Sequence, residues 1–378
     1  MFISRPSIVS AFGGGEELFE ALKNGERKFV AKRIFGKEFL VSKVAYELPE
    51  FPERTGEIYK TRTNRILLAA ILGLKGEIDK AVRKYGKDRV GAVIGTTTTG
   101  VEENLRAFEG EKFDTAEFKI DRNSLCNPAE FAREFLGLKG AALGISTACT
   151  SGIKAFDSAI NLINLGVCDA VVAGGVDSLN SLTLLGFNSL GVLSKKPCMP
   201  FDTNREGINI GEGAGLFVLS KDEISPFRIK AVAGNADAFH ITQPDPNANM
   251  QIRLIKELLR RTNLRDTDFI SLHATGTLAN DAMEARAVAQ TLPSTLCSGI
   301  KANIGHTLAA AGAIEAGVCV LAMEQSVAPM QIISDFDQNL QPLNLVLENE
   351  RKEIKNCLNL SFAFGGDNAA MIIGKTGE

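Results

Sequence analysis

Short apolar runs and helical patterns alternate along most of the chain. Apart from Arg89 and Asp169 at or near their starts, the runs at 89–95, 168–174 and 215–219 are continuously apolar, as strands are when both faces of a sheet are buried. Between such runs lie amphipathic segments, for example 65–74 and 250–261, whose apolar residues recur at helical spacing. This alternation predicts an α/β fold in which helices cover the sheets.

The alternating pattern also repeats. Three strand-and-turn units recur in the same order, and the joint between the repeats falls near residues 221–228, where charge and Pro226 interrupt the pattern. Chance similarity is the alternative, because strand–turn–helix units are common. We therefore predict two halves of the same fold, residues 1–224 and 225–378. The matched pairs are 90–100 with 269–277, 145–149 with 300–306, and 170–175 with 360–366.

Cys149 lies where a predicted strand gives way to a helix. Residues 141–145 form a short apolar run, residues 146–152 are small and mostly polar, and apolar residues recur at helical spacing from Ile153 onwards. A thiol at a helix N-terminus meets unpaired backbone N–H groups and the positive end of the helix dipole, which both favour the nucleophilic thiolate. The alternative is that Cys149 is a small packing residue, as most single cysteines are.

Composition excludes several classes of protein. The 42 basic and 45 acidic residues give a net charge of -3, so nothing favours nucleic-acid binding. The seven cysteines are odd in number and form no C-x-x-C pair, so neither a zinc site nor a disulfide framework is predicted. We also expect no signal peptide and no membrane span, because the first residues lack the required basic and apolar regions and no run of 18 uncharged apolar residues occurs. A cytoplasmic protein is expected.

Two of the three histidines share the setting of Cys149. His273 and His306 lie in turns rich in glycine and threonine that follow predicted strands, where active-site groups of α/β proteins commonly emerge. If the halves are related, the turns that hold Cys149 and His306 are equivalent and face each other. A structural, hydrogen-bonded role is the alternative for both, and it is the role expected for His240.

Five motifs together resemble those of the β-ketoacyl-acyl carrier protein synthases, in the elongating branch that has a Cys-His-His site. They occur in the family's order over residues 90–374. The motifs are Thr147-Ala148-Cys149 with Ser151-Gly152, the His-x-Thr-Gly-Thr-x-x-Asn-Asp run at 273–281, Lys301 with Gly305-His306, residues 200–205 with 211–215, and residues 364–368.

This resemblance implies a thiolase-like fold with duplicated halves in a layered αβαβα architecture, a homodimer, and no metal or organic cofactor. It implies an acyltransferase in which Cys149 holds an acyl group while His273 and His306 stabilise the enolate formed when malonyl thioester loses CO2. It assigns the oxyanion hole to the backbone N–H groups of Cys149 and Phe364. The Phe364 side chain would gate the acyl pocket, with Ile208 in a loop beside it.

The resemblance also assigns roles to charged residues. Glu315 lies in a largely apolar helical segment, where an unpaired carboxylate is costly, so we expect a buried pair with Lys301 near the site. A surface salt bridge is the alternative. Acyl carrier proteins, the implied partners, are acidic, and Lys60, Arg62 and Arg65 lie where related enzymes hold basic docking residues. A solvated helix face is the competing interpretation of these three.

Several residues depart from the family pattern, among them Ile208-Asn209, which stand where Phe-Val is more usual. Ala274 and Ala363 stand where glycine is usual, so the backbone must be compatible with a methyl group at both. Asp367 stands where threonine is usual, and we hypothesise that its carboxylate raises the pKa of His306 or pairs with Lys301. The departures favour a specialised polyketide or polyene branch over housekeeping fatty acid synthesis.

Two other functions share the implied fold. A degradative thiolase uses a second cysteine as base, whereas this chain offers two histidines. A chain-length partner subunit of a polyketide system lacks the nucleophile, whereas this chain has Cys149. A heterodimer between this chain and such a partner is also compatible with the sequence.

Overall fold

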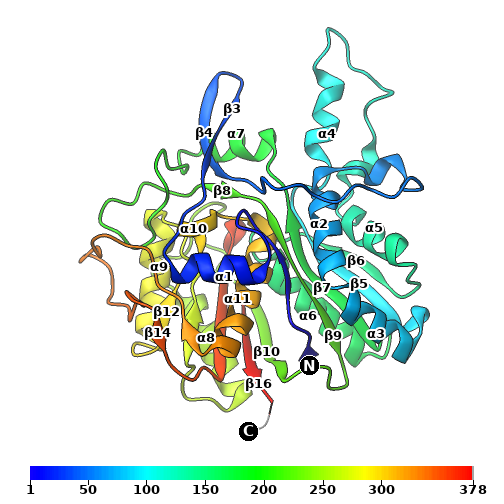
Figure 1. Cartoon of the computed structure of the whole chain (residues 1–378). Helices are drawn as coiled ribbons and strands as arrows, with labels where there is room; N and C mark the ends of the chain where they lie inside the picture. Colours follow the sequence, from blue (N-terminus) through cyan, green and yellow to red (C-terminus); the bar gives the residue numbers. More distant parts are fainter. Residues whose placement is uncertain (377–378) are drawn as a thin grey trace.

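Two sets of strands with the same connectivity form the centre of the computed structural model, which describes residues 1–376 (Figure 1). In the first set, β5 pairs in parallel with β6 and β7, and β7 pairs antiparallel with β9. In the second, β11 pairs in parallel with β12 and β15, and β15 pairs antiparallel with β16. The repeated order confirms the predicted duplication. The bounds are β5 Val90–Gly95, β6 Ala142–Ile145, β7 Ala170–Asp177, β9 Gly213–Ser220, β11 Phe269–Ser271, β12 Leu296–Ser298, β15 Asn356–Phe362 and β16 Asp367–Lys375.

The N-terminus joins the two sets. Strand β1 (Phe2–Ile3) pairs with β9 on one side and with β10 (Phe227–Ala236) on the other, while β10 continues to β16. Strand β2 (Ser7–Val9) also pairs with β9. The pairing therefore runs without a break from one half to the other, and the division at residues 224 and 225 stays a prediction.

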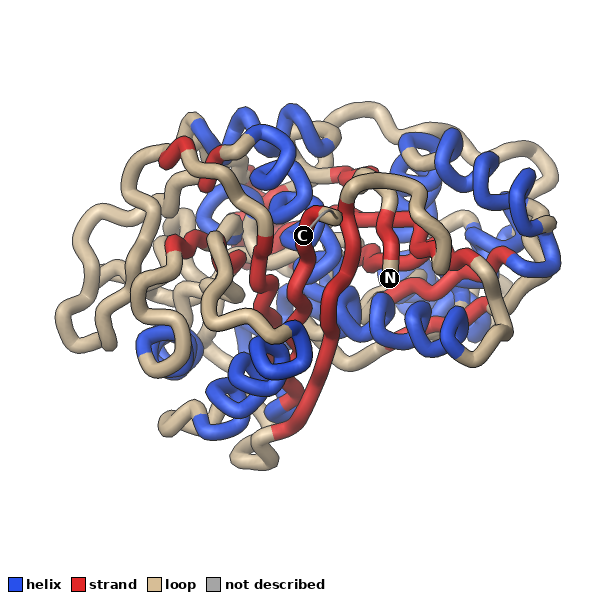
Figure 2. The backbone as a smooth tube through the Cα atoms, turned by 90° about the horizontal axis from the view of Figure 1, so that it is seen from below, coloured by secondary structure: helices blue, strands red, loops and turns tan. Residues whose placement is uncertain are grey.

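Helices form three layers around these strands. Helices α6 (Ser151–Asn164) and α11 (Ala311–Gln325) pack between the two sets of strands, and Figure 2 shows helices on both sides of the strands as well. The resulting order of helix, sheet, helix, sheet and helix is the predicted αβαβα arrangement. The outer helices are α2 (Arg62–Gly73), α3 (Lys75–Tyr85) and α5 (Asn127–Leu136) on the first half, and α8 (Asn249–Thr262) and α9 (Leu278–Ala289) on the second.

Helix α11 is buried on all sides because it lies between the halves. The segment Leu308–Gln325 is long and apolar enough to span a membrane by composition, but 89% of it is buried inside the protein. An all-round apolar helix is typical of the core of a large protein. This segment is therefore part of the protein core.

Two helices begin earlier than predicted, and a side-chain cap accounts for the first of them. Helix α2 begins at Arg62, three residues before the predicted start, because the Thr61 side chain accepts a hydrogen bond from the Asn64 N–H at 3.1 Å. Helix α6 has no side-chain cap and begins at Ser151, two residues before the apolar periodicity becomes visible at Ile153. The first turn after Cys149 is therefore already helical.

The remaining elements lie outside the five layers or connect them. Strands β3 and β4 form a hairpin that projects from it, and α4 projects beside them (Figure 1). Strand β8 pairs in parallel with β4 and connects the hairpin to the core. The bounds are β3 Val30–Ile34, β4 Lys37–Ser42, β8 Ile210–Gly211, β13 Val327–Ala328, β14 Glu350–Arg351, α1 Gly15–Lys23, α4 Val101–Leu105, α7 Ser181–Ser189, α10 Lys301–Ile304, and the 3-10 helices η1 Glu57–Tyr59, η2 Lys87–Arg89, η3 Arg106–Phe108, η4 Ile120–Asn123, η5 Leu308–Ala310 and η6 Phe364–Gly366.

Candidate active site

A tight turn before α6 presents the sulfur of Cys149. Ala148 adopts a φ of 54°, in the left-handed region, and the turn is held by Ser151, whose Oγ donates to the Ala148 carbonyl at 2.5 Å. From the other half, Ser361 Oγ donates to the Cys149 carbonyl at 2.9 Å. A Cβ at Gly152 would lie 2.6 Å from the Ala309 carbonyl oxygen, so this approach of the halves requires glycine. The turn leaves Cys149 only 9% exposed.

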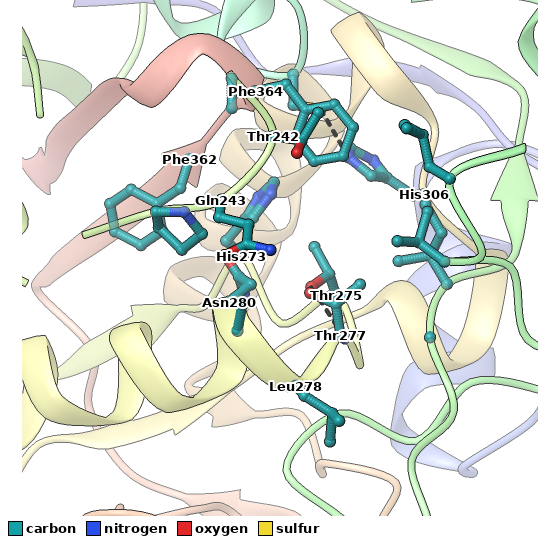
Figure 3. Close-up of a pocket in the computed structure, with 18 of the residues that line it drawn as sticks. Thr242, Gln243, His273, Thr275, Thr277, Leu278, Asn280, His306, Phe362 and Phe364 are labelled. Atoms are coloured by element: carbon teal, nitrogen blue, oxygen red, sulfur yellow. Dashed lines mark hydrogen bonds between the residues drawn. The ribbon is translucent and has the colours of Figure 1, made fainter. Parts of the chain in front are cut away.

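The two predicted histidines meet this sulfur. His306 Nε2 lies 2.9 Å from Cys149 Sγ, and the His273 and His306 rings lie edge to face with their centroids 5.3 Å apart. The sulfur and one nitrogen of each ring all lie within 4.8 Å of one another. Figure 3 shows both histidines bordering one pocket. Three groups from opposite halves therefore converge, as the repeat predicted.

The hydrogen bonds at Nδ1 determine the tautomer of each ring. His306 Nδ1 accepts from the Leu308 N–H at 3.2 Å, and His273 Nδ1 faces Lys301 Nζ at 3.4 Å. An imidazole whose Nδ1 accepts carries its proton on Nε2. Burial, then the charge of Lys301, lower the pKa of both rings well below the ordinary value, and His306 lowers that of His273 further. Both rings are therefore neutral Nε2–H donors.

Lys301 and Glu315 form a buried pair behind these rings. Their side chains are 1% and 0% exposed, and Lys301 Nζ lies 2.5 Å from Glu315 Oε1. Burial raises the pKa of Glu315, and Lys301 opposes that rise. The pair is therefore inside the protein, as predicted, and the surface alternative is excluded. Glu315 thereby holds Lys301 in place, with the ammonium group of Lys301 facing His273.

The predicted lowering of the Cys149 pKa is wrong for the free protein. Burial raises the pKa of this thiol to about 12, although the charge of Lys301 acts in the opposite direction. Withdrawal of the sulfur from water therefore outweighs its place before a helix N-terminus. Cys149 is a thiol at neutral pH, and the nearby Nε2–H of His306 stabilises the thiolate once the proton has left.

A raised pKa predicts how the reactivity of Cys149 depends on pH. The thiolate is the nucleophile, and below its pKa the thiolate fraction rises tenfold per pH unit. We therefore expect the rate of Cys149 alkylation by iodoacetamide to increase about tenfold per unit between pH 7 and 9. Mass spectrometry after timed labelling measures the rate, and the Cys149→Ala variant supplies the background from the other cysteines. A plateau between pH 7 and 8 would contradict the raised pKa.

Two buried carboxylates that position the site were not found from the sequence. Glu284 accepts from the backbone N–H groups of His273 at 2.6 Å and Ala274 at 2.7 Å, and burial raises its pKa to about 8. Asp177 accepts from the Thr97 N–H and from the Ala309 N–H, both at 2.8 Å, which ties β5 to the turn after His306. The sequence could have indicated them, because each is an acidic residue inside an apolar helix or strand, where a buried carboxylate needs hydrogen-bond partners.

Asp281 explains why two of the motifs occur together. Its carboxylate accepts from the Gly276 N–H at 3.1 Å within its own motif and from the Phe201 N–H at 2.8 Å in the other. Arg205 Nε lies 3.5 Å from the same carboxylate and Arg205 Nη1 lies 2.8 Å from Asp337. The 200–205 segment is therefore a support for the turn that carries His273.

The sulfur borders two cavities. The first, of about 320 Å³, also contains His273, His306, Thr275 and Ile208, and the second, of about 430 Å³, is mostly apolar. Phe364 borders both cavities, is 37% exposed, and stacks on Phe187 with ring centroids 5.6 Å apart. The predicted gating residues Phe364 and Ile208 thus lie beside the sulfur. The second cavity is lined by Thr97, Ala148, Cys149, Thr183, Gly186, Phe187, Ser189, Leu190, Leu308 and Phe364.

The departures from the family pattern have different consequences. Ala363 is extended, with a φ of −127°, so it has no need of glycine. Ala274 adopts a φ of 45°, and a Cβ placed at Gly299 would lie 2.3 Å from its methyl group. The methyl group of Ala274 is thus accommodated because the facing residue is glycine.

The hypothesis for Asp367 is wrong. Its carboxylate pairs with Lys154 and accepts from Thr150 Oγ1, whereas Lys301 pairs with Glu315. The pKa of His306 is lowered, by burial and by Lys301, and not raised. Lys154 lies one turn into α6, and its side chain and that of Asp367 both border one cleft.

The three predicted docking residues lie at the start of α2, and each has an acidic partner. Lys60 pairs with Glu57, and Arg65 Nη2 lies 2.6 Å from Glu50. The partner of Arg62 is the buried Glu212, with Nε and Oε2 2.8 Å apart. Arg62 therefore has a structural contact, and docking by these residues stays a prediction.

Comparisons with known proteins agree with this geometry. The chain matches the family model for the beta-ketoacyl synthase N-terminal domain over residues 76–224 and the C-terminal domain over residues 227–334. It is 31% identical to nodulation protein E of Rhizobium meliloti over 306 residues, which are 75% of each chain. It is 36% identical to 3-oxoacyl-(acyl-carrier-protein) synthase 2 of Rhizobium meliloti strain 1021 over 258 residues, 62% of this chain and 61% of that one.

Solved structures extend the similarity to nearly the whole chain. A chain from the solved complex of the ketosynthase ApeO with its chain length factor ApeC, from Xenorhabdus doucetiae, superimposes with a TM-score of 0.92 at 32% identity, over 99% of this chain and 98% of that one. A type II polyketide ketosynthase structure with its acyl carrier protein superimposes at 0.88 with 22% identity, over 100% and 99% of the chains, and supports the fold alone.

Proposed function

Because this chain belongs to the beta-ketoacyl synthase family, we propose that it condenses a malonyl group on acyl carrier protein with an acyl group held on Cys149, releasing CO2. The observation that carries the proposal is the convergence of the Cys149 sulfur with two neutral imidazoles, one of them 2.9 Å away. The product is a 3-oxoacyl thioester on the carrier, and the enzyme is an acyltransferase.

The first step is transfer of the acyl group. The Cys149 sulfur attacks the carbonyl of the acyl thioester, the carrier thiol leaves, and the proton of Cys149 ends on that thiol. A tetrahedral oxyanion forms on the way, and the backbone N–H groups of Cys149 and Phe364 are the proposed donors to it. The mostly apolar cavity beside Cys149 has the chemistry to hold the acyl chain.

The second step makes and uses a carbanion. The malonyl carbon–carboxylate bond breaks, CO2 leaves, and the electron pair passes into an enolate. Two Nε2–H donors, from His273 and His306, stabilise the enolate oxygen without giving up a proton. The enolate carbon attacks the acyl carbonyl on Cys149, and the sulfur leaves as a thiolate that His306 stabilises.

The alternatives have less support. A degradative thiolase needs a second cysteine beside the first, and among the described residues that line the two cavities Cys149 is the one cysteine. A non-catalytic chain-length subunit has no use for a nucleophile. We propose acyl carrier protein as the partner, pairing with a second copy or with a related subunit, and a cytoplasmic location. The heterodimer gains support from the ApeO structure, which contains a chain length factor.

Release of CO2 from malonyl-acyl carrier protein tests the reaction and separates it from thiolase chemistry. Changing either His273 or His306 to alanine should lower the rate about 10²–10³-fold, because each removes one donor to the enolate. The third histidine supplies a matched control, since His240 is exposed and, among the described residues, its ring forms hydrogen bonds with Thr242 alone. His240→Ala should keep the parent rate. Unchanged CO2 release in both active-site variants would refute the assigned roles.

A further inference from the structure

Asp367 connects the two segments that carry the proposed oxyanion hole. It is the first residue of β16, directly after the turn of η6, and its carboxylate accepts from Thr150 Oγ1 and from Lys154 Nζ. Thr150 is the residue after Cys149, and Lys154 lies in the first turns of α6. The contacts span 217 and 213 positions of the chain, so they exist only in the folded protein.

Asp367 forms a hydrogen bond with a residue next to each proposed oxyanion-hole donor. Its side chain holds Thr150, next to Cys149, and its carbonyl accepts from the Ala363 N–H at 2.8 Å, next to Phe364. Within residues 1–376, neither the Cys149 N–H nor the Phe364 N–H donates to an acceptor of another residue. Two free donors are thus carried by segments that meet at Asp367.

Asp367 acts on these segments from outside the substrate space. Neither cavity that contains Cys149 has Asp367 among its described lining residues. The carboxylate opens instead, with Lys154, to a separate cleft that also contains Asp157 and Asn235. The Lys154 and Asp367 side chains are 27% and 23% exposed, whereas Thr150 is fully buried. A substrate in the cavities beside Cys149 does not touch the carboxylate.

We propose that Asp367 is a positioning residue for acyl transfer, which sets the separation of the Cys149 and Phe364 amide groups by holding Thr150 and Ala363 at once. The inference rests on the proposed function. Donors stabilise an oxyanion only within about 2.7–3.1 Å of the oxygen, so a small change in their separation slows the step.

Two reactions of the same sulfur test the proposal. Acylation of Cys149 by an acyl-acyl carrier protein passes through an oxyanion, whereas alkylation by iodoacetamide is a displacement that forms none. Asp367→Ala should slow acylation about 10–100-fold, a loss up to that of removing one oxyanion-hole donor. The alkylation rate should stay within about twofold, because the sulfur itself is unchanged. Intact-protein mass spectrometry follows both reactions.

Companion variants separate positioning from folding. Asp367→Asn keeps an acceptor for Thr150 and should retain most of the acylation rate. Thr150→Val removes the other end of the bond and should reproduce the loss, and the double variant Asp367→Ala/Thr150→Val should be no slower than either single one. Lys221→Met, which removes an exposed ion pair with Asp169, is the control and should match the parent in both rates.

The outcomes are distinct. Selective loss of acylation in Asp367→Ala and Thr150→Val supports the inference. Equal acylation rates in these variants and the parent would overturn it, as would a parallel loss of acylation and alkylation. Should Asp367→Ala fail to fold, normal acylation by Thr150→Val would overturn it equally. A parent protein that forms no acyl-enzyme would instead refute the proposed function and this inference with it.

Discussion

Replacing Cys149 with alanine should abolish both the acyl-enzyme and condensation, with a loss of at least about 10⁴-fold in the rate of 3-oxoacyl product formation. The reason is that no other described residue lining both cavities offers a thiol. Incubation with an acyl-acyl carrier protein and malonyl-acyl carrier protein, followed by mass spectrometry of the enzyme and the product, measures both losses.

Cys126→Ala is the matched control for this result. Cys126 belongs to the same half and is partly exposed, and its sulfur accepts from the Gly144 N–H at 3.2 Å, away from both cavities. Its removal should leave the acyl-enzyme and the product rate within about twofold, as expected for a residue outside the site. An acyl-enzyme that persists in Cys149→Ala would exclude Cys149 as the nucleophile.

Breaking the Lys301–Glu315 pair should give the largest loss of stability. Lys301→Met leaves Glu315 buried without a counter-charge, which costs about 3–5 kcal/mol in the free energy of unfolding. Replacing both partners, in Lys301→Met/Glu315→Leu, should recover most of that loss because two apolar side chains then fill the space. Urea unfolding measures the stabilities.

Activity should not follow stability in this series. In the double variant His273 Nδ1 no longer faces the ammonium group that lies 3.4 Å away in the parent, so CO2 release should stay low. Lys84→Met, which breaks an exposed pair with Asp222, should leave the free energy of unfolding and the activity close to those of the parent, because exposed ion pairs contribute little. Full activity of the double variant would show that the mechanism does not need Lys301. A double variant as unstable as Lys301→Met would show that the unpaired carboxylate is not the cause of the lost stability.

Local patterns were sufficient for the α/β class and for the positions of several strands. The continuous apolar runs at 89–95 and 168–174 became β5 and β7, and their recurrence in the second half became β11 and β15. Such runs are reliable because a strand buried on both faces must be apolar throughout. The turns rich in small residues drew attention to Cys149, His273 and His306, but their candidate roles came from the resemblance of five ordered motifs to a known family.

Contacts between distant segments could not be predicted in the same way. In the sequence, Glu284 and Asp177 are isolated acidic residues. In the folded protein, backbone N–H groups from other segments of the chain donate to both. Asp367 was expected to act on His306 or to pair with Lys301, but its partners are Thr150 and Lys154, at the start of α6. Which residues pair depends on how far each side chain extends and on how the two halves pack. The spacing of residues along the chain gives neither.

By itself, then, the sequence predicted an α/β fold from periodicity and its duplication from recurring strand-and-turn units, and the family resemblance of its motifs singled out Cys149, His273 and His306 as the candidate reacting side chains. Only the tertiary structure decided how those side chains ionise. Cys149 shows the reason: its place before a helix favours the thiolate, but the second half of the protein covers it and excludes water, and burial raises its pKa to about 12. Exclusion of water depends on every segment packed around a group, and no single stretch of sequence encodes it.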